Sequence, residues 1–154
     1  QPRHRTGNGE IVALAGGEFL RAGGDTFGLH SHGGKGFLQP AHALLQAVRL
    51  MHYRRVICAF QPHTYSRTKA LFQSFVDELR TADQVVLADI YAAREQNTVG
   101  VSSQELAAEI PGAVYCPSLQ GVTAYLRENA QPGDIILTVG AGDIYKAGEA
   151  LFTE

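Results

Sequence analysis

The sequence is poor in several residue types that would narrow its class. Among 154 residues there is no tryptophan, one methionine and only two cysteines. So few cysteines exclude a disulfide-rich scaffold. Cys58 and Cys116 each lie in an apolar run, so we expect buried, reduced thiols in a cytoplasmic protein rather than a disulfide or a metal-binding pair.

Long hydrophobic segments are also missing. No apolar run approaches the ~20 residues needed to cross a bilayer, and the first ten residues, QPRHRTGNGE, lack the apolar core of a signal peptide. We therefore expect no membrane as a partner. Because the first residue is Gln1 rather than Met, we also expect the chain to begin inside a longer one.

Charge of one sign is not concentrated anywhere. Residues 1–55 hold seven Lys and Arg against three Asp and Glu, but the longest basic cluster is Arg54-Arg55 and no aromatic residues are interleaved. We therefore expect a solvated surface and no nucleic acid as a partner. The hydrophobic content of 45% is typical of a globular protein, and the length suits one domain.

Residues 1–39 remain an unassigned, glycine-rich segment, since they hold ten of the seventeen glycines. Within them we predict a strand in EIVALA (10–15) and a second short strand in EFLRAGG (18–24). GLHSHGGKG (28–36) looks like a phosphate-binding P-loop, but its spacing is one residue too long and glycine replaces the Ser or Thr that holds magnesium. His30 and His32 have no further ligands at metal-binding spacing.

From Pro40 onward, strands and helices alternate. PAHALLQAVRLMH (40–52) predicts a helix that buries Leu44, Leu45, Val48 and Met51. Strands are predicted at 55–60, 84–90, 113–116 and 134–139, and helices near 71–79, 103–110, 118–129 and 143–152. This alternation, with near-continuous apolar strands, predicts an α/β fold whose mostly parallel sheet carries helices on both faces.

Three polar segments directly follow predicted strands: QPHTYSRT (61–68), YAAREQNTVG (91–100) and GAGD (140–143). In a parallel sheet all carboxyl ends share one edge, where ligands bind, so these segments should face a common crevice. His63 and Arg67 are not needed for a turn. A guanidinium fork and an imidazole near a helix start favour an anion site, although solvated loop residues are the alternative. Ser66 or Thr68 is a candidate helix cap.

The other two segments are more ambiguous. Asp89 ends a predicted strand, where an acid is costly unless paired, so it either serves the crevice with Arg94 or accepts backbone hydrogen bonds. Gly140 and Gly142 form a strand–turn–helix connection that lets backbone amides approach an anion, but taken alone the pattern favours an ordinary tight turn. Asp143 is positioned as an N-cap, and its charge would oppose an anion.

Three stretches together resemble one family: FQPHTYSRTKALFQSFVDEL, ADIYAAREQNTVGVSSQELA and GDIILTVGAGDIYKAGEAL. They are similar to the C-terminal domain of the Mur ligases, and FQPHTYSRT favours the member that adds L-alanine to UDP-N-acetylmuramate in peptidoglycan synthesis. The resemblance covers about residues 40–154 and implies a Rossmann-like domain.

The resemblance implies an ATP-dependent ligase in which a central ATPase domain carries the P-loop and this domain closes the site. ATP with Mg²⁺ would activate the muramate carboxylate as an acyl phosphate, which the amine of L-alanine attacks. By the same analogy His63 and Arg67 orient the alanine carboxylate, Tyr65 supports the loop, and Gly140 and Gly142 shape the crevice.

The sequence departs from the family in two respects. The family's Asp-Asp-Tyr-x-His-His-Pro stretch is replaced by GKGFLQP, in which only Pro40 matches, and the central ATPase domain is absent from the chain. We therefore expect no ligation and no bound cofactor from this chain alone. The alternative interpretation is a non-catalytic α/β binding module or a remnant of a ligase gene.

Overall fold

The computed structural model describes residues 10–15, 20–22, 25–27, 38–140 and 142–153. GLHSHGGKG (28–36), with His30 and His32, lies outside the described residues, as does most of GKGFLQP. Within the described part, no helix is long and apolar enough to span a bilayer.

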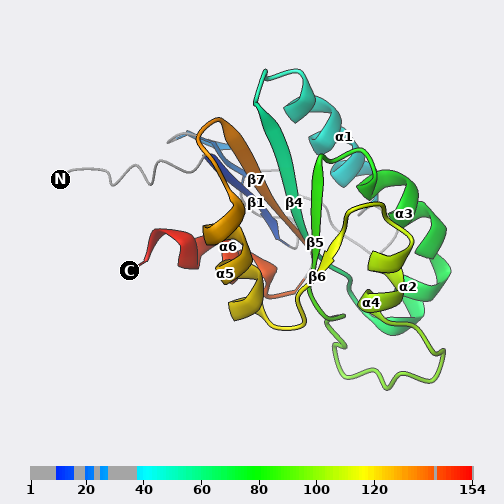
Figure 1. Ribbon diagram of the computed structural model, residues 1–154. Helices are drawn as coiled ribbons and strands as arrows, with labels where there is room; N and C mark the ends of the chain where they lie inside the picture. Colours follow the sequence, from blue (N-terminus) through cyan, green and yellow to red (C-terminus); the bar gives the residue numbers. More distant parts are fainter. Residues whose placement is uncertain (1–9, 16–19, 23–24, 28–37, 141, 154) are drawn as a thin grey trace.

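A five-stranded sheet forms the centre of the fold, and its strands lie side by side in the order β1-β7-β4-β5-β6 (Figure 1). Every adjacent pair in this sheet is parallel. The strands are β1 (Glu10–Ala15), β4 (Arg55–Gln61), β5 (Gln84–Leu87), β6 (Val114–Tyr115) and β7 (Asp134–Gly140). A separate antiparallel pair consists of β2 (Leu20–Ala22) and β3 (Asp25–Phe27).

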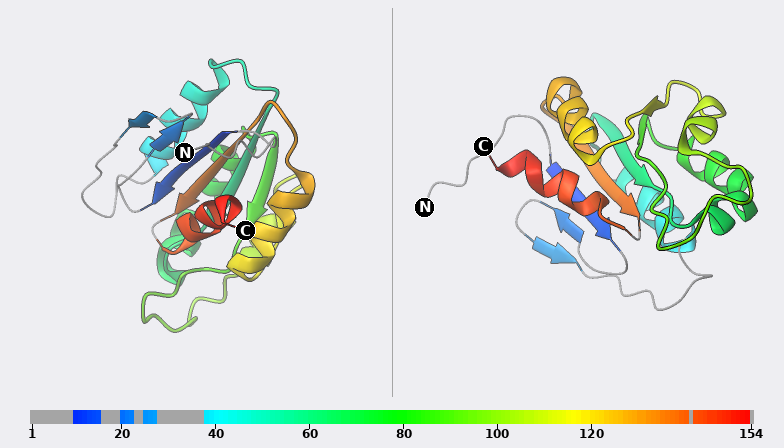
Figure 2. Two further views of the ribbon diagram at one scale, coloured as in Figure 1. Left: turned by 90° about the vertical axis from the view of Figure 1, so that its left-hand side faces the viewer. Right: turned by 90° about the horizontal axis from the view of Figure 1, so that it is seen from below.

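Helices cover both faces of the sheet (Figure 2). One face packs against α1 (Leu38–Arg49), α3 (Phe72–Leu79) and α4 (Ser103–Ala108), and the other against α5 (Leu119–Asn129) and α6 (Ile144–Glu149). The short α2 (Tyr65–Ala70) follows β4, and a 3-10 turn (Ala150–Phe152) follows α6. The predicted fold class is thus confirmed, as is the strand at 10–15.

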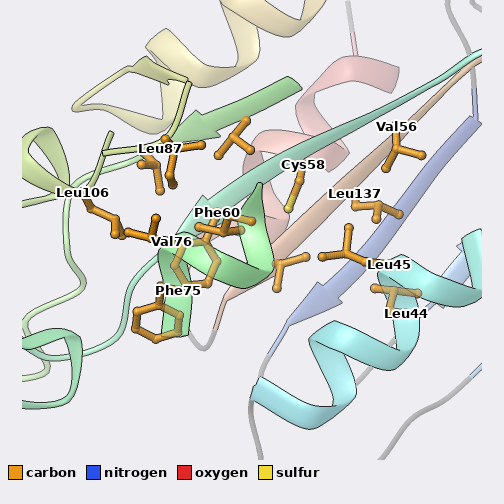
Figure 3. Close-up of a cluster of buried hydrophobic side chains, with 14 of the residues drawn as sticks. Leu44, Leu45, Val56, Cys58, Phe60, Phe75, Val76, Leu87, Leu106 and Leu137 are labelled. Carbon is orange, nitrogen blue, oxygen red and sulfur yellow. The ribbon is translucent and has the colours of Figure 1, made fainter. Parts of the chain in front are cut away.

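The two faces form two hydrophobic cores because side chains alternate along each strand. In β4, Cys58 and Phe60 enter the core below α1 and α3, while Ile57 and Ala59 enter the core below α5 and α6. Figure 3 shows the first core, where Phe60 packs against Phe75 with ring centroids 5.1 Å apart. Burial on both faces explains why β4 and β7 are almost uninterrupted apolar runs.

The helix expected at 40–52 is displaced toward the N-terminus. α1 begins at Leu38, so Pro40 lies in its first turn, where an amide would have no acceptor within the helix. The prediction that Met51 is buried is wrong: α1 ends at Arg49, and Met51 is 52% exposed. His52 then adopts a left-handed φ of 59°, which turns the chain toward β4.

One strand is shorter than the sequence predicts. β5 ends at Leu87 instead of residue 90, and the Asp89 amide bonds to the Pro117 carbonyl rather than to β4. The helix expected near 71–79 is confirmed as α3, and Leu71, with a φ of −108°, separates it from α2.

The two cysteines lie on opposite faces of the sheet, and neither forms a disulfide. Cys58 is buried, as expected, and its burial raises the pKa of the thiol to about 12. Cys116 is only half-buried, which corrects the prediction that both thiols are buried.

At the opposite edge from the strands' carboxyl ends, Asp134 is a fully buried acid at the start of β7. It accepts hydrogen bonds from Arg55 at 2.7 Å, from Arg54 at 3.2 Å and from the Gln131 amide at 2.9 Å. Burial alone would raise the pKa of Asp134, but the Arg55 hydrogen bond, the Gln131 amide and the two guanidinium charges hold it below its ordinary value. This cluster ties β4 to the turn before β7.

Candidate functional site

Three polar segments meet at the carboxyl edge of the sheet, as predicted. β4 and β7 end together, since Gln61 pairs with Gly140, and Phe60 pairs with Leu87 at the end of β5. The loop between β5 and α4 projects from this edge, at the bottom of Figure 1. The segments after β4, β5 and β7 are therefore neighbours in space.

His63 is fixed against the loop that follows β5. The Thr64 amide donates to the Tyr91 carbonyl, and the Tyr91 amide donates to the Pro62 carbonyl, both at 2.8 Å. The rings of His63 and Tyr91 stack with centroids 5.7 Å apart and planes inclined by 13°. These contacts extend the pairing of the two chains beyond the strands and orient the imidazole.

The residue after His63 has a strained backbone. Thr64 has φ 62° and ψ 146°, a conformation that costs a β-branched residue about 1–3 kcal/mol. The bond from its amide to Tyr91 and a 2.6 Å bond from the Thr68 hydroxyl to its carbonyl hold it in place. Such strain is typical of functional sites, where the surrounding structure maintains it.

The start of α2 is capped by a residue from the other loop. Glu95 accepts hydrogen bonds from the Ser66 amide at 3.0 Å and from the Ser66 hydroxyl. The bond from the Ser66 hydroxyl lowers the pKa of Glu95 most, and the bond from the Ser66 amide lowers it further. The prediction that Ser66 or Thr68 caps α2 is therefore wrong, and so is the idea that the start of α2 is available to an anion, because a carboxylate already occupies it.

Gly140 and Gly142 are required by close packing between the loops. A Cβ on Gly140 would lie 2.8 Å from the Gln61 carbonyl oxygen. A Cβ on Gly142 would lie 2.7 Å from Gln61 Oε1 and 2.8 Å from Tyr91 Cγ, closer than real contacts allow. The β7 turn therefore packs directly on Gln61 and Tyr91, which joins all three segments at one place.

The polar groups of this edge retain hydrogen-bonding capacity. Within the described residues, the buried atoms Gln61 Oε1 and His63 Nδ1 have no hydrogen-bond partner, and the Arg67 guanidinium forms no ion pair. Burial lowers the pKa of His63, and the positive charge of Arg67 lowers it further, against an opposing effect of Glu95. His63 is thus a neutral hydrogen-bonding group beside a cation.

Asp89 and Arg94 differ from their predicted environment. Asp89 lies beyond the end of β5 and is exposed, so the expected cost of an acid inside a strand does not arise. Its carboxylate accepts a hydrogen bond from the Tyr115 hydroxyl, which raises the pKa of Tyr115 to about 12. Arg94 is exposed in the loop after β5, with a left-handed φ of 76°.

Asp143 precedes α6 in the N-cap position, but its side chain makes no capping bond. Instead it pairs with Lys146 at 3.0 Å, which raises the pKa of that lysine. Tyr65 begins α2, and its amide also bonds to Glu95.

The sequence reasoning missed Gln61 and Tyr91. Both directly follow strands predicted from the sequence, at 55–60 and 84–90, and that position is the signal that would have marked them. Among residues 38–140, 142–153 and the described strands before them, no three His, Cys, Asp or Glu side chains are grouped as metal ligands.

The all-parallel sheet, covered by helices on both faces, places the chain in the class of Rossmann-like α/β domains. The sequence match is more specific. Residues 39–142 match the glutamate ligase domain of the Mur ligases, and the chain belongs to this family.

Curated relatives agree with that membership. Proteins named UDP-N-acetylmuramate–L-alanine ligase are 46% identical over 111 residues in Acetivibrio thermocellus and 50% identical over 112 residues in Agathobacter rectalis. Each match covers 70% of this chain and 24% of the relative, so the chain spans about a quarter of their length.

In the structural comparison, a crystal structure of a domain from a proposed UDP-N-acetylmuramate:L-alanyl-gamma-D-glutamyl-meso-diaminopimelate ligase of Haemophilus ducreyi 35000HP has a TM-score of 0.56. It is 18% identical, and the alignment covers 96% of this chain and 91% of that one. This likeness shows the fold alone.

Proposed function

We propose that residues 40–154 are the C-terminal domain of a cytoplasmic ligase that adds L-alanine to UDP-N-acetylmuramate in peptidoglycan synthesis. The names of the relatives support this proposal, since their identities of 46% and 50% fall on this region of the chain. The observation that carries it is the Arg67 guanidinium, which forms no ion pair within the described part of the chain, beside a fixed, neutral His63 at the carboxyl edge of the sheet.

In this proposal His63 and Arg67 hold the carboxylate of L-alanine. Arg67 supplies the charge and a planar pair of donors that match two carboxylate oxygens. His63 supplies a neutral hydrogen bond, because its lowered pKa keeps it uncharged near pH 7. Holding the carboxylate leaves the amine of L-alanine free and oriented for attack. Such positioning of two reactants accelerates the reaction between them.

The other edge residues have supporting roles. Tyr65 begins the helix that carries Arg67, while Gly140 and Gly142 allow the β7 turn to approach Gln61 and Tyr91. Asp89 and Arg94 lie further out, at the rim of the proposed crevice.

The chemistry of activation belongs to the rest of the enzyme. ATP with Mg²⁺ would activate the muramate carboxylate on a central ATPase domain, which is the proposed partner of this chain together with the two substrates. Within the described residues, no three His, Cys, Asp or Glu side chains lie close enough together to hold a metal ion.

The first test is titration of ¹⁵N-labelled chain with L-alanine, followed by NMR. Arg67→Ala should weaken binding of L-alanine about tenfold or more, because the variant loses a charged hydrogen-bond donor to the carboxylate. Arg80→Ala is the matched control, because Arg80 is an exposed arginine at the end of α3, and it should bind like the parent. If Arg67→Ala binds as well as Arg80→Ala, the assigned role of Arg67 is wrong.

A further inference from the structure

Glu95 is a charged group that reaches from the β5 loop to the helix carrying Arg67 and forms hydrogen bonds with it. The proposed carboxylate site draws His63 and Arg67 from the segment after β4, yet two of its supports come from residues 91–95 of the other loop. Tyr91 holds the backbone of Thr64 and stacks on His63. Glu95 holds the first turn of α2.

The contacts of Glu95 are those of a capping carboxylate supplied from a distance. It is 29 residues from Ser66 in sequence and accepts from both the Ser66 amide and hydroxyl. The turn that delivers it contains Ala93 and Arg94 with left-handed φ values of 48° and 76°. Two consecutive non-glycine residues in that region are costly, so the surrounding structure must hold the turn in place.

The position of Arg67 depends on this first turn. Arg67 is the residue after Ser66, and α2 has only six residues, too few to be stable without tertiary contacts. The side chain of the N-cap residue Thr64 makes no capping bond to α2. The direction of the Arg67 side chain is therefore set by whatever fixes Ser66.

We propose that Glu95 is a positioning residue that holds α2 so that Arg67 and His63 meet the same carboxylate. The inference rests on the proposed function, and it assigns to the β5 loop a part in binding without contact to the substrate. This role also explains why the Glu95 carboxylate is tolerated near an anion site. Its negative charge is stabilised by hydrogen bonds from the amide and hydroxyl of Ser66.

The test uses a pair of matched variants of the same chain. Glu95→Ala removes the cap of α2. Glu105→Ala removes an equivalent cap elsewhere, since Glu105 accepts from the Ser102 amide at 2.9 Å and from the Ser102 hydroxyl at 3.1 Å at the start of α4. Both variants lose a similar pair of hydrogen bonds, so a general loss of stability affects both alike.

Two readouts are measured for each variant by NMR. Glu95→Ala should weaken L-alanine binding about tenfold, as expected for loss of the contact that orients a charged donor, while Glu105→Ala stays within about twofold of the parent. In the free chain, the Ser66 amide should exchange faster and the Arg67 Nε–H signal should move only in Glu95→Ala. Glu95→Gln, which keeps one acceptor oxygen, should recover part of the affinity.

The outcomes separate this inference from the proposed function. If the parent chain does not bind L-alanine, the proposed function fails, and the Arg67 and Ser66 signals alone judge the positioning role. If Glu95→Ala leaves those signals unchanged, or lowers affinity no more than Glu105→Ala, Glu95 does not position Arg67.

Discussion

Asp134 shows how the stability of this fold depends on single buried charges. It is completely buried, yet two guanidinium groups and a backbone amide satisfy it. Removing one charged member leaves the remaining buried charges without a partner. This costs more free energy of folding than replacing the whole ion pair by apolar residues. His63 illustrates the opposite solution at the other edge, where a half-buried imidazole has its pKa lowered by burial and by the charge of Arg67.

We expect Asp134→Asn to lower the free energy of unfolding by about 3 kcal/mol, at the low end for a broken buried pair because Arg55 is 30% exposed. Urea unfolding measures this value. Asp77→Asn is the control, since Asp77 is exposed and bonds to the nearby Gln73 side chain on the same helix. Equal stabilities of the two variants would contradict the structural role of Asp134.

The same acid gives stability a defined pH dependence. The pKa of Asp134 is lower in the folded chain than its ordinary value of 3.8. Its contribution is therefore complete above that ordinary value and is lost as the pH falls through the lower folded value. Unfolding curves of the parent should lose stability in this acidic range, and those of Asp134→Asn should lose less. Parallel curves for the two proteins would show that Asp134 is not the titrating group.

The loops at the carboxyl edge act together as one element. Tyr91 bonds to the backbone on both sides of His63, Glu95 caps α2, and Gly142 packs on Tyr91 and Gln61. Each loop is thus held by another loop rather than by its own sequence. A substitution in one of these loops should therefore alter the environment of the His63 ring.

Gly142→Ala tests this dependence. Its added Cβ would collide with Tyr91, so we expect the Tyr91 ring to leave the His63 stack, with a loss of about 1–3 kcal/mol in unfolding free energy. The His63 ring signals in NMR should shift. Gly112→Ala is the control, because Gly112 has no atom within 4 Å of a Cβ and only its φ of 74° is strained. Unchanged His63 signals in Gly142→Ala would show that the β7 turn does not support the stack.

The molecule as a whole could be predicted from its sequence to the level of its class. Apolar strands alternating with amphipathic helices gave the parallel sheet, and the sheet placed His63, Tyr91 and Gly142 on one edge. The structure has a capping box between Ser102 and Glu105. Both partners lie within one turn, so a local pattern of this kind can be recognised from the sequence.

The remaining features depend on contacts between distant residues. Local sequence suggested Ser66 or Thr68 as the cap of α2, but the acceptor is Glu95 from another loop. The sequence predicts Asp89 in a strand because its neighbours are apolar. In the structure the strand ends at Leu87, and the Asp89 amide bonds to the Pro117 carbonyl, just after β6. The strand order, with β4 between β7 and β5, likewise follows from packing and not from any local pattern.

The most direct test compares L-alanine with L-alaninamide, which has the same side chain and amine but no carboxylate. Each is titrated into the ¹⁵N-labelled chain at equal concentration. We expect L-alanine to shift the signals of His63 and Arg67, and L-alaninamide to leave them unchanged, because both residues are assigned to the carboxylate. Equal shifts with the two ligands, or L-alanine shifts confined to other parts of the chain, would contradict a carboxylate site at this edge of the sheet.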